Sequence, residues 1–241
     1  MINVEDFVKR QIAVFQENEV LEEHERRPGR GREGNLSYGP YSLISREKGA
    51  GGNTVARLVG RRLGWQVFDN EIIDEIAQKA HVRRQLIESL DERDRATIQD
   101  IIGQLLNSQE IGTAGYLGYL KQVVLTLGHH GDVVIVGHGA RFILPDQFGL
   151  SVRMVAPIEA RTRRIAVKAR LNLEAARVEV ERIDRERVKL VRRHFGHDVT
   201  DPLSHDLIIN TAAISVEAAA EVVITALQRK LGVKIKASGQ R

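Results

Sequence analysis

The chain has 241 residues, enough for a buried core in one large domain or in one domain with a small appendage. Hydrophobic residues make up 42% and charged residues 28%, and no apolar run approaches the roughly 18 residues that span a membrane. No signal-peptide pattern opens the sequence, so we expect a soluble protein of the cytoplasm. The absence of cysteine excludes disulfides, thiolate catalysis and cysteine-ligated zinc.

The net charge of +4 favours anionic partners. A nucleic-acid-binding surface would combine basic and aromatic side chains, but only 5% of residues are aromatic, and acids alternate with bases along most predicted helices. Arginines that clamp the phosphates of a small nucleotide explain the excess as well. We therefore expect a nucleotide or another small phosphorylated substrate, with no membrane partner and with nucleic acid disfavoured.

The first forty residues are predicted to form an appendage. Apolar residues from Val4 to about residue 25 recur at helical spacing and indicate an amphipathic helix. Glycines, prolines and arginines at 28–40 are typical of a mobile linker. The helix is expected either to dock on the main domain or on a second copy of the chain, or to act as an arm that recruits a partner. A homodimer through this helix is the expected assembly.

The main domain is predicted at 41–235, with a tail at 236–241. Short apolar runs alternate there with longer helical stretches, which is the pattern of βα units around a parallel sheet. A three-layer α/β domain follows from that alternation. The five expected strands are at 41–45, 65–68, 132–137, 151–157 and 205–210.

Two helical segments, 70–131 and 158–195, are long for connections in such a sheet. Excursions of this length often cover a ligand site at the carboxyl ends of the strands. Glycines at 112, 115 and 118 are expected to interrupt the first segment, and a last helix is predicted at 216–231.

A glycine-rich stretch, REKGAGG at 46–52, joins the first strand to a helix that begins NTVARLVGRRLG. A P-loop, GxxxxGK[ST], binds phosphates through backbone N–H groups at a helix N-terminus, a lysine and a magnesium-binding hydroxyl. The topology here is that of a P-loop, but the lysine is missing. A tight turn that binds nothing also fits the glycine cluster by itself.

The run GAGGNTVARLVGRRLGWQVFDNEII resembles the cytidylate kinase family, in particular its cytidylate kinase-like branch, whose loop is similar to SREKGAGGNT. The similarity continues through VVIVGHGARFILPD, APIEARTRRI, VERIDRERVKLV and DLIINTAAISVEAAAEVV. It implies a P-loop kinase fold with a five-stranded parallel sheet, a substrate-binding insertion at 70–131 and a lid at 158–195. It also implies ATP and Mg²⁺ as cofactors.

Within the loop, the resemblance assigns the missing lysine to Gly52 and the first loop glycine to Arg46. Lys48 and Arg46 are the nearby cations able to supply the lost charge, while the backbone N–H groups and the helix dipole remain. If the loop has P-loop geometry, Gly52→Lys is expected to strengthen ATP binding. The expected cofactor-binding residues are Arg46, Lys48, Gly49, Ala50, Gly51, Gly52, Asn53 and Thr54, of which Asn53 and Thr54 would contact magnesium.

Asp69 ends the second predicted strand, where a carboxylate can hold magnesium's water shell or accept a proton from the attacking group. It can equally cap the next helix. In GHGARF, His138 and Gly139 stand where the family carries an arginine and an aspartate, and Arg141 is a candidate phosphate ligand. The expected substrate-binding residues are Asp69, His138, Arg141 and Asp184.

The two charged helices of the predicted lid carry arginines at 161, 163, 164, 185 and 187. Arginine on a closing lid suits the charge of a transferring phosphoryl group, although such residues are by default a solvated, salt-bridged face. The expected catalytic residues are Asp69, Arg161, Arg164 and Arg187. Zinc chemistry at the histidines is set aside because no H-E-x-x-H spacing occurs.

Two functions follow from these observations. The first is an ATP-dependent phosphotransferase of the nucleoside monophosphate kinase type, for which the resemblance suggests CMP or dCMP as acceptor. The second is a nucleotide-binding or sensing protein with little or no transferase activity, because Gly52 and Gly139 replace a lysine and an acid. A basic protein associated with nucleic acid is a third, weaker hypothesis.

Overall fold

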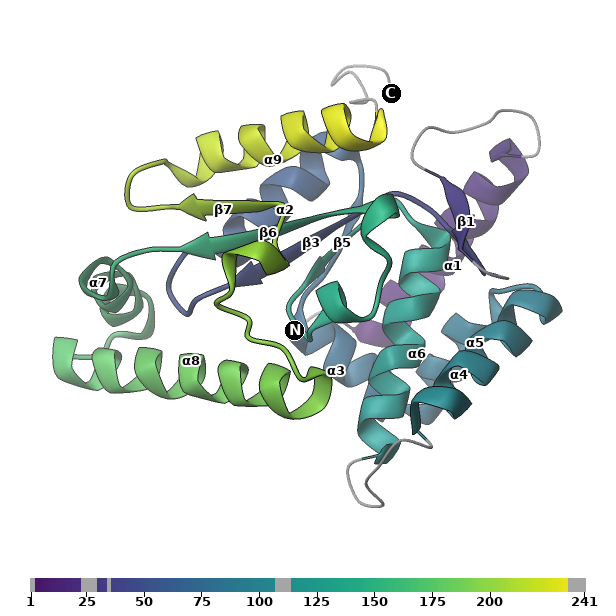
Figure 1. Cartoon of the computed structure of the whole chain (residues 1–241), viewed down its shortest axis with the longest axis horizontal. Coiled ribbons are helices and arrows are strands. Elements are labelled where there is room, and N and C mark those ends of the chain that lie inside the picture. Colours follow the sequence, from purple (N-terminus) through teal and green to yellow (C-terminus); the bar gives the residue numbers. More distant parts are fainter. Residues whose placement is uncertain (1–2, 23–29, 34–35, 107–113, 234–241) are drawn as a thin grey trace.

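The computed structural model describes residues 3–22, 30–33, 36–106 and 114–233. Its centre is a parallel five-stranded sheet in the order β4-β5-β3-β6-β7, so the predicted α/β fold is confirmed (Figure 1). Each expected strand is present within a few residues of its predicted position. The strands are β3 (Tyr41–Arg46), β4 (Gln66–Phe68), β5 (Val133–Val136), β6 (Gly149–Val155) and β7 (Leu207–Asn210).

The central strands β3, β5 and β6 are largely buried because helices cover both faces of the sheet. All four residues of β5 are buried, as are five of the six in β3. Parallel pairing aligns Ile44 with Val136 on one side of β3, and Arg46 with Met154 on the other. The carboxyl ends of these three strands therefore lie together, and Arg46 is the last residue of the central one.

On one face of the sheet, α2 (Gly52–Leu63) packs against α9 (Val216–Leu231). Val55 and Val59 of α2 and Val223 of α9 belong to the apolar cluster between these helices and the sheet. The helix α9 begins where Ser215 accepts a hydrogen bond from the N–H of Ala218, which satisfies a free donor of its first turn. Its bounds are those predicted from the sequence.

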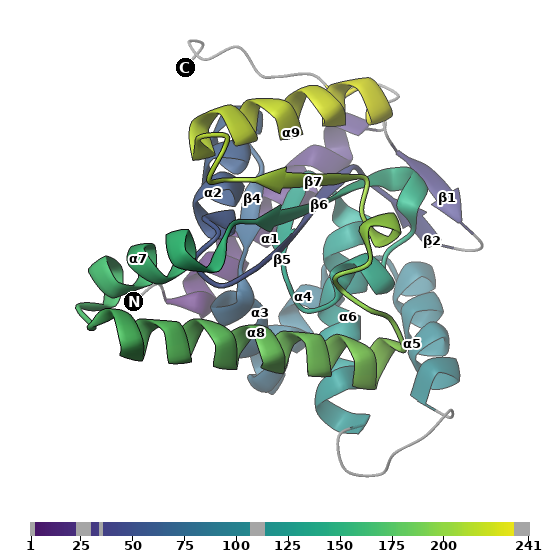
Figure 2. The same cartoon turned by 60° about the vertical axis from the view of Figure 1, so that its left-hand side comes forward.

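On the other face lie α1 (Val4–Glu22), α3 (Asn70–Gln78), α4 (Ala80–Glu88), α5 (Glu92–Leu106) and α6 (Ala114–His130) (Figure 2). The predicted helical segment at 70–131 thus consists of four helices within its described residues. Gly115 and Gly118 lie inside α6, so the expected interruption is wrong at these two positions. A helical glycine costs only about 1 kcal/mol relative to alanine, which the packing of α6 on α3 and α5 outweighs. Position 112 lies outside the described residues.

The predicted lid is a pair of helices, α7 (Ile158–Ala169) and α8 (Leu173–Phe195), packed against each other. α7 follows the carboxyl end of β6, and α8 passes alongside the sheet (Figures 1 and 2). Asn172 caps α8 by accepting from the N–H of Ala175. Three short 3₁₀ turns complete the fold, at Ala140–Phe142, Asp146–Phe148 and Pro202–Ser204.

The linker predicted at 28–40 is wrong for six residues, which form an antiparallel pair of strands, β1 (Gly31–Glu33) and β2 (Leu36–Tyr38). The glycine and proline content suggested mobility, but the alternation in LSY buries Leu36 and Tyr38. Tyr38 also stacks on Phe148 at 5.5 Å between ring centroids. Residues 23–29 and 34–35 lie outside the described ranges.

Helix α1 packs on its own chain. Val4, Val8 and Phe15 are buried in the cluster formed with α3, α4 and α6, and Phe7 meets Phe68 edge to face at 5.4 Å. Of the expected roles, docking on the main domain therefore describes this helix. The homodimer stays a prediction, and the apolar face that suggested it is covered within the chain. The domain division at residue 40 also stays a prediction.

Candidate functional site

The glycine-rich loop between β3 and α2 lines one cavity and has several backbone N–H groups that are free to bind a ligand. Gly49 and Gly51 adopt φ of 85° and 77°, a region that favours glycine. The N–H groups of Gly49, Gly51, Gly52 and Asn53 have no hydrogen-bond acceptor among the described residues. They lie at the N-terminus of α2, an arrangement that binds anions.

Three carbonyl groups of the same loop accept hydrogen bonds from arginines of the lid helices. Arg187 Nη1 donates to the carbonyl oxygen of Arg46 at 3.1 Å, and Arg161 Nη1 donates to that of Lys48 at 3.2 Å. Arg164 Nη1 donates to the oxygen of Gly49 at 3.3 Å. Because the C=O and N–H of one peptide point in opposite directions, the bond to Lys48 O helps to orient the free N–H of Gly49, which belongs to the same peptide.

Arg161 is the centre of the contact between the lid helices and the loop. It is buried, its Nε lies 3.2 Å from Glu47 Oε2, and it forms an ion pair with Asp184. Asp184 in turn accepts a hydrogen bond from the N–H of Lys48 at 2.7 Å. Arg164 is likewise engaged, with Thr211 Oγ1 at 2.9 Å and Thr211 O at 2.6 Å. Arg161, Arg164 and Asp184 therefore anchor the loop, and their expected contacts with substrate stay predictions.

Arg46 differs from these anchors because its hydrogen-bond acceptors are neutral. Its Nε donates to Asn53 Oδ1 at 3.2 Å and its Nη2 to Asn70 Oδ1 at 2.6 Å. It forms no ion pair with a carboxylate in the described part of the chain. Burial, and next the charge of Arg187, lower the pKa of Arg46 to about 9. A buried cation without a counterion favours the arrival of an anion.

Two further arginines approach the same place, Arg187 from α8 and Arg153 from β6. Burial lowers the pKa of both guanidinium groups. Arg187 Nη1 is 3.9 Å from Asp184, a looser pairing than that of Arg161, and Arg153 Nη1 donates to Ser45 Oγ at 3.0 Å. Arg153 was missed in the sequence, where a charged residue inside the apolar run SVRMV was the available signal.

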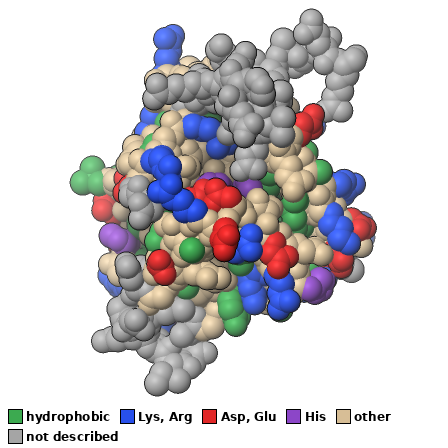
Figure 3. All heavy atoms as spheres, turned by 90° about the vertical axis from the view of Figure 1, so that its right-hand side faces the viewer, with side chains coloured by type: hydrophobic (Ala, Val, Ile, Leu, Met, Phe, Trp, Pro, Cys, Tyr) green, Lys and Arg blue, Asp and Glu red, His purple; other side chains and the backbone are tan. Residues whose placement is uncertain are grey.

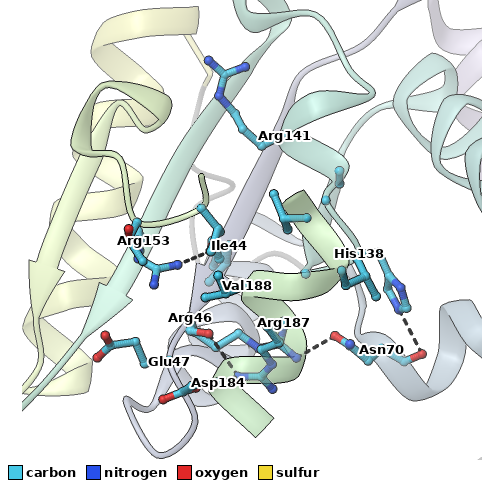
Figure 4. A pocket seen from close by; sticks show the side chains of 18 of the residues that line it. Ile44, Arg46, Glu47, Asn70, His138, Arg141, Arg153, Asp184, Arg187 and Val188 are labelled. Carbon is cyan, nitrogen blue, oxygen red and sulfur yellow. Dashed lines mark hydrogen bonds and ion pairs between the residues drawn. The ribbon is translucent and has the colours of Figure 1, made fainter. Parts of the chain in front are cut away.

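Two cavities meet beside Arg46 and Arg187. The loop cavity, of about 390 Å³, contains the glycine-rich loop, Thr54, Arg57, Asp69, Arg164 and Lys168. The strand-end cavity, of about 480 Å³, lies beyond the carboxyl ends of β3, β5 and β6. Arg46, Glu47, Asn70 and Arg187 line both. Figure 4 shows Arg46 and Arg187 beside each other between Asp184 and Asn70.

Asp69 and Asn70 lie at the start of α3. Asp69 caps this helix by accepting from the N–H of Ile72 at 3.3 Å, and it also lines the loop cavity, so its two predicted roles are compatible. The side-chain oxygen of Asn70 accepts from Arg46, and its carbonyl oxygen lies 3.3 Å from His138 Nε2. Asn70 was missed in the sequence, because an asparagine at a helix start has no distinctive pattern.

His138 and Arg141 line the strand-end cavity, but they lie differently. His138 is buried, has φ of 56°, and sits 3.6 Å from Asp74 Oδ1; burial lowers its pKa despite that carboxylate. Arg141 donates hydrogen bonds from Nη1 and Nη2 to the two carboxylate oxygens of Asp146, and from Nε to Ser204 O at 2.9 Å. It lies apart from Arg46 and Arg187 in Figure 4, and its expected role as a phosphate ligand stays a prediction.

Lys48 lines the loop cavity and also a groove of about 670 Å³ between α7 and α8. Burial, and next Arg187, lower the pKa of its ammonium group. Its side chain shares both spaces with Ile165 and Lys168. Lys48 therefore borders the loop on the lid side, whereas Arg46 lies between the two cavities.

Magnesium would find oxygen ligands in the loop cavity, which suits its preference for carboxylate, hydroxyl and water. The hydroxyl of Thr54 and the carboxylate of Asp69 line that cavity. Asn53 fits less well than predicted, because its side-chain oxygen accepts from Arg46. Within the described ranges, no group of three or more His, Asp or Glu side chains is placed to hold a metal.

Acidic and basic side chains are intermixed on the face seen in Figure 3, whereas a binding surface for nucleic acid gathers basic ones. Among the described helices, none combines the length and hydropathy needed to cross a membrane.

Comparison with known proteins agrees with this geometry. Residues 43–213 match the cytidylate kinase-like family. A cytidylate kinase of Ignicoccus hospitalis is 28% identical over 75% of this chain and 95% of its own length, and one of Sulfolobus acidocaldarius is 22% identical over 78% and 94%. The crystal structure of an uncharacterized protein from Eubacterium ventriosum has a TM-score of 0.64 and 18% identity, covering 79% of this chain and 98% of that one. Loop, sheet order and sequence thus agree, and the protein belongs to the cytidylate kinase-like family.

Proposed function

We propose that the protein is an ATP-dependent phosphotransferase of the nucleoside monophosphate kinase type. The observation that carries this proposal is the meeting of two cavities at Arg46 and Arg187, directly beside the free N–H groups of the loop. A donor in one cavity and an acceptor in the other would place their phosphates between these two cations. Curated relatives named cytidylate kinase support CMP or dCMP as the first acceptors to test.

In this reaction, an oxygen of the acceptor's phosphate attacks the γ-phosphorus of ATP, the bond to the bridging oxygen breaks, and ADP leaves. Catalysis of this kind depends on positioning and on stabilising the charge of the transferring group. The loop N–H groups would hold the donor phosphates, while Arg46 and Arg187 would face the transferring phosphoryl group. Magnesium, held with the nucleotide near Thr54 and Asp69, would neutralise phosphate charge.

The strand-end cavity would bind the acceptor. Arg153 supplies a cation to this cavity and not to the loop cavity, and the apolar side chains of Ile44 and Val188 border it (Figure 4). His138, Asp74 and Tyr116 line it as well and offer hydrogen-bonding groups, with the Tyr116 hydroxyl donating to Asp74. We propose that the acceptor's phosphate lies toward Arg153 and Arg187. The same proposal includes Mg²⁺ as the metal that accompanies ATP. It also includes the cytoplasm as the compartment in which the protein acts.

The test is a calorimetric titration with ATP, followed by assays of ATP consumption with each nucleoside monophosphate. The proposal predicts that ATP binds and that at least one monophosphate stimulates its conversion to ADP. ATP binding without turnover for any acceptor would refute the kinase activity.

That second outcome would favour a nucleotide-binding protein without transferase activity. One observation speaks for this candidate: Asp184 already accepts the N–H of Lys48, a loop donor, so one N–H of the loop is not free for phosphate. Gly52 and Gly139 also leave two positions of the family's pattern without their charged groups.

A further inference from the structure

Arg46 crosses the start of α2 and fills the space next to Gly52. A Cβ atom built at Gly52 would lie 2.7 Å from Cβ and 2.9 Å from Cγ of Arg46. Folded proteins do not tolerate such distances, and the atoms concerned belong to the stem of Arg46, close to its own backbone. Position 52, where a P-loop carries its lysine, therefore accepts only glycine while Arg46 keeps this conformation.

A second glycine makes room for the other end of the same side chain. A Cβ at Gly137 would lie 2.3 Å from Nη1 of Arg46 and 2.7 Å from Oδ1 of Asn70, and Gly137 has φ of 85°. Gly137 follows β5, which pairs directly with β3. Two glycines on separate elements thus surround the path of Arg46 from its stem to its guanidinium group.

Three other cations near the loop, Arg161, Arg164 and Lys48, are less able to take the place of the lysine. Arg161 is occupied by Glu47 and Asp184, and Arg164 by Thr211. Lys48 lines the loop cavity and the groove between α7 and α8, but not the strand-end cavity. Arg46, in contrast, is 9% exposed, lines both cavities and donates only to the amide oxygens of two asparagines among the described residues.

We propose that Arg46 is the phosphate-binding cation of this loop and replaces the missing lysine from the opposite end of the glycine-rich stretch. The side chain of Arg46 can take this place only because positions 52 and 137 are glycines. A planar guanidinium group can bind two phosphate oxygens at once, so it would grip the terminal phosphates of the donor with more directional specificity than an ammonium group. The inference rests on the proposed function only in taking those phosphates to belong to ATP.

This arrangement reverses the expected effect of Gly52→Lys. The sequence predicted that this substitution would strengthen ATP binding in a loop of P-loop geometry. The structure predicts no gain, because the new side chain collides with Arg46. A lysine at position 52 is expected to strengthen ATP binding only in a variant that also lacks the Arg46 side chain, so both positions must be substituted together.

The experiment compares four variants with the native chain by calorimetric titration with inorganic tripolyphosphate and, separately, with MgATP. Arg46→Met keeps a stem of similar length and removes the charge. Gly52→Lys adds a lysine against Arg46, and the double variant Arg46→Gly/Gly52→Lys moves the cation to the P-loop position. Arg62→Ala, an exposed arginine on α2 that pairs with Glu221, is the control. Thermal unfolding checks that each variant is folded.

We expect Arg46→Met to bind tripolyphosphate and MgATP roughly 10- to 100-fold more weakly than the native chain, since a charge-assisted hydrogen-bonded pair is lost. Gly52→Lys should bind no more tightly than the native chain. The double variant should bind at least tenfold more tightly than Gly52→Lys alone, on the same scale of loss. Arg62→Ala should bind like the native chain.

The proposal is overturned if folded Arg46→Met binds tripolyphosphate as tightly as the native chain, if Gly52→Lys alone binds more tightly, or if the native chain does not bind tripolyphosphate. Should Arg46→Met fail to fold, the double variant and Gly52→Lys decide: equal affinities overturn the proposal. Arg46-dependent tripolyphosphate binding without ATP consumption for any acceptor would refute the kinase activity alone and leave the role of Arg46 standing.

Discussion

The loop cavity and the strand-end cavity differ in how the chain builds them. The loop cavity takes much of its lining from one continuous stretch, 46–54, and the rest from the starts of α2 and α3 and from the lid helices. The strand-end cavity is assembled from β3, α3, α6, β6, α8 and the segment after β5, which are distant in sequence. The first cavity therefore has a recognisable motif, while the second depends on the whole fold.

The cations around the two cavities also divide into two groups. Arg161 and Arg164 hold carbonyl oxygens or carboxylates and shape the loop. Arg46, Arg153 and Arg187 are buried or half-buried with weaker pairing, and burial lowers the pKa of each. We propose that Arg161 and Arg164 serve mainly structure, whereas Arg187, which also donates to a loop carbonyl, serves ligand binding. Substitutions should separate these roles.

The largest effect is expected for Arg187→Ala. If Arg187 faces the transferring phosphoryl group as proposed, its removal should lower kcat by roughly 100- to 1,000-fold, with a smaller change in ATP affinity. Single-turnover kinetics measure the first and calorimetry the second. Arg182→Ala, an exposed residue of α8 paired with Glu179 and Glu186, is the control and should leave both unchanged. An unchanged kcat in Arg187→Ala would contradict the role given to it.

Arg161→Ala should act on stability. The substitution leaves the carboxylates of Glu47 and Asp184 partly buried without their partner, which should lower the free energy of unfolding by about 3 kcal/mol. Urea denaturation measures this loss. Arg177→Ala removes an exposed pair of the same kind on α8 and should change stability far less. Equal effects of the two substitutions would show that Arg161 is no anchor.

Arg153→Met should affect the strand-end cavity alone. Because Arg153 lines that cavity and not the loop cavity, we expect the KM for the acceptor to rise roughly 10- to 50-fold while ATP affinity stays the same. Initial-rate kinetics over a range of acceptor concentrations test this. A parallel loss of ATP affinity would mean that the two cavities do not bind separate ligands.

Lys168→Ala is the converse substitution, with a smaller effect. This exposed lysine lines the loop cavity and not the strand-end cavity, so ATP affinity should fall about two- to fivefold with no change in acceptor KM. The loss should shrink at high salt, since an exposed charge is screened. A salt-independent effect, or a change in acceptor KM, would go against this assignment.

His138→Asn tests whether the buried histidine of the strand-end cavity makes the stability of the protein depend on pH. Burial holds the pKa of His138 below the 6.5 of an unfolded histidine, so the unfolded chain takes up a proton first as pH falls. The stability from neutral His138 is present above pH 6.5 and is lost as pH falls through its folded pKa. The drop in melting temperature between pH 7.5 and pH 5 should therefore be smaller in His138→Asn, where asparagine tolerates the left-handed backbone. A drop in melting temperature as large as that of the native chain would show that His138 does not cause the loss of stability at low pH.

Much of the fold was predictable because periodicity reports burial directly. The apolar run at 132–137 became the buried strand β5, and the last helix has the predicted bounds, 216–231. The pair β1 and β2 was missed because local composition favoured mobility, whereas burial of Leu36 depends on distant helices. Tertiary contacts of this kind leave no signal within a short window of sequence.

The site was predictable only in part, for a related reason. The loop itself was found, including Arg46 as a candidate cation, since strand, glycines and helix are contiguous. The ion pairs of Arg161 with Glu47 and Asp184, and of Arg141 with Asp146, were not predicted. They depend on how side chains from different helices and strands are placed relative to each other. Asn70 and Arg153 gain their importance only from the meeting of β3, β6 and α3.

The most direct test of the central claim, that the two cavities hold donor and acceptor with their phosphates meeting at Arg46 and Arg187, uses an inhibitor that spans both. Adenosine and cytidine joined through five phosphates should bind more tightly than ATP or CMP alone, since linking two ligands makes the second binding event intramolecular. Calorimetry should further show that Arg153→Met and Lys168→Ala each weaken this compound. Binding no tighter than that of ATP, and unaffected by Arg153→Met, would contradict the account.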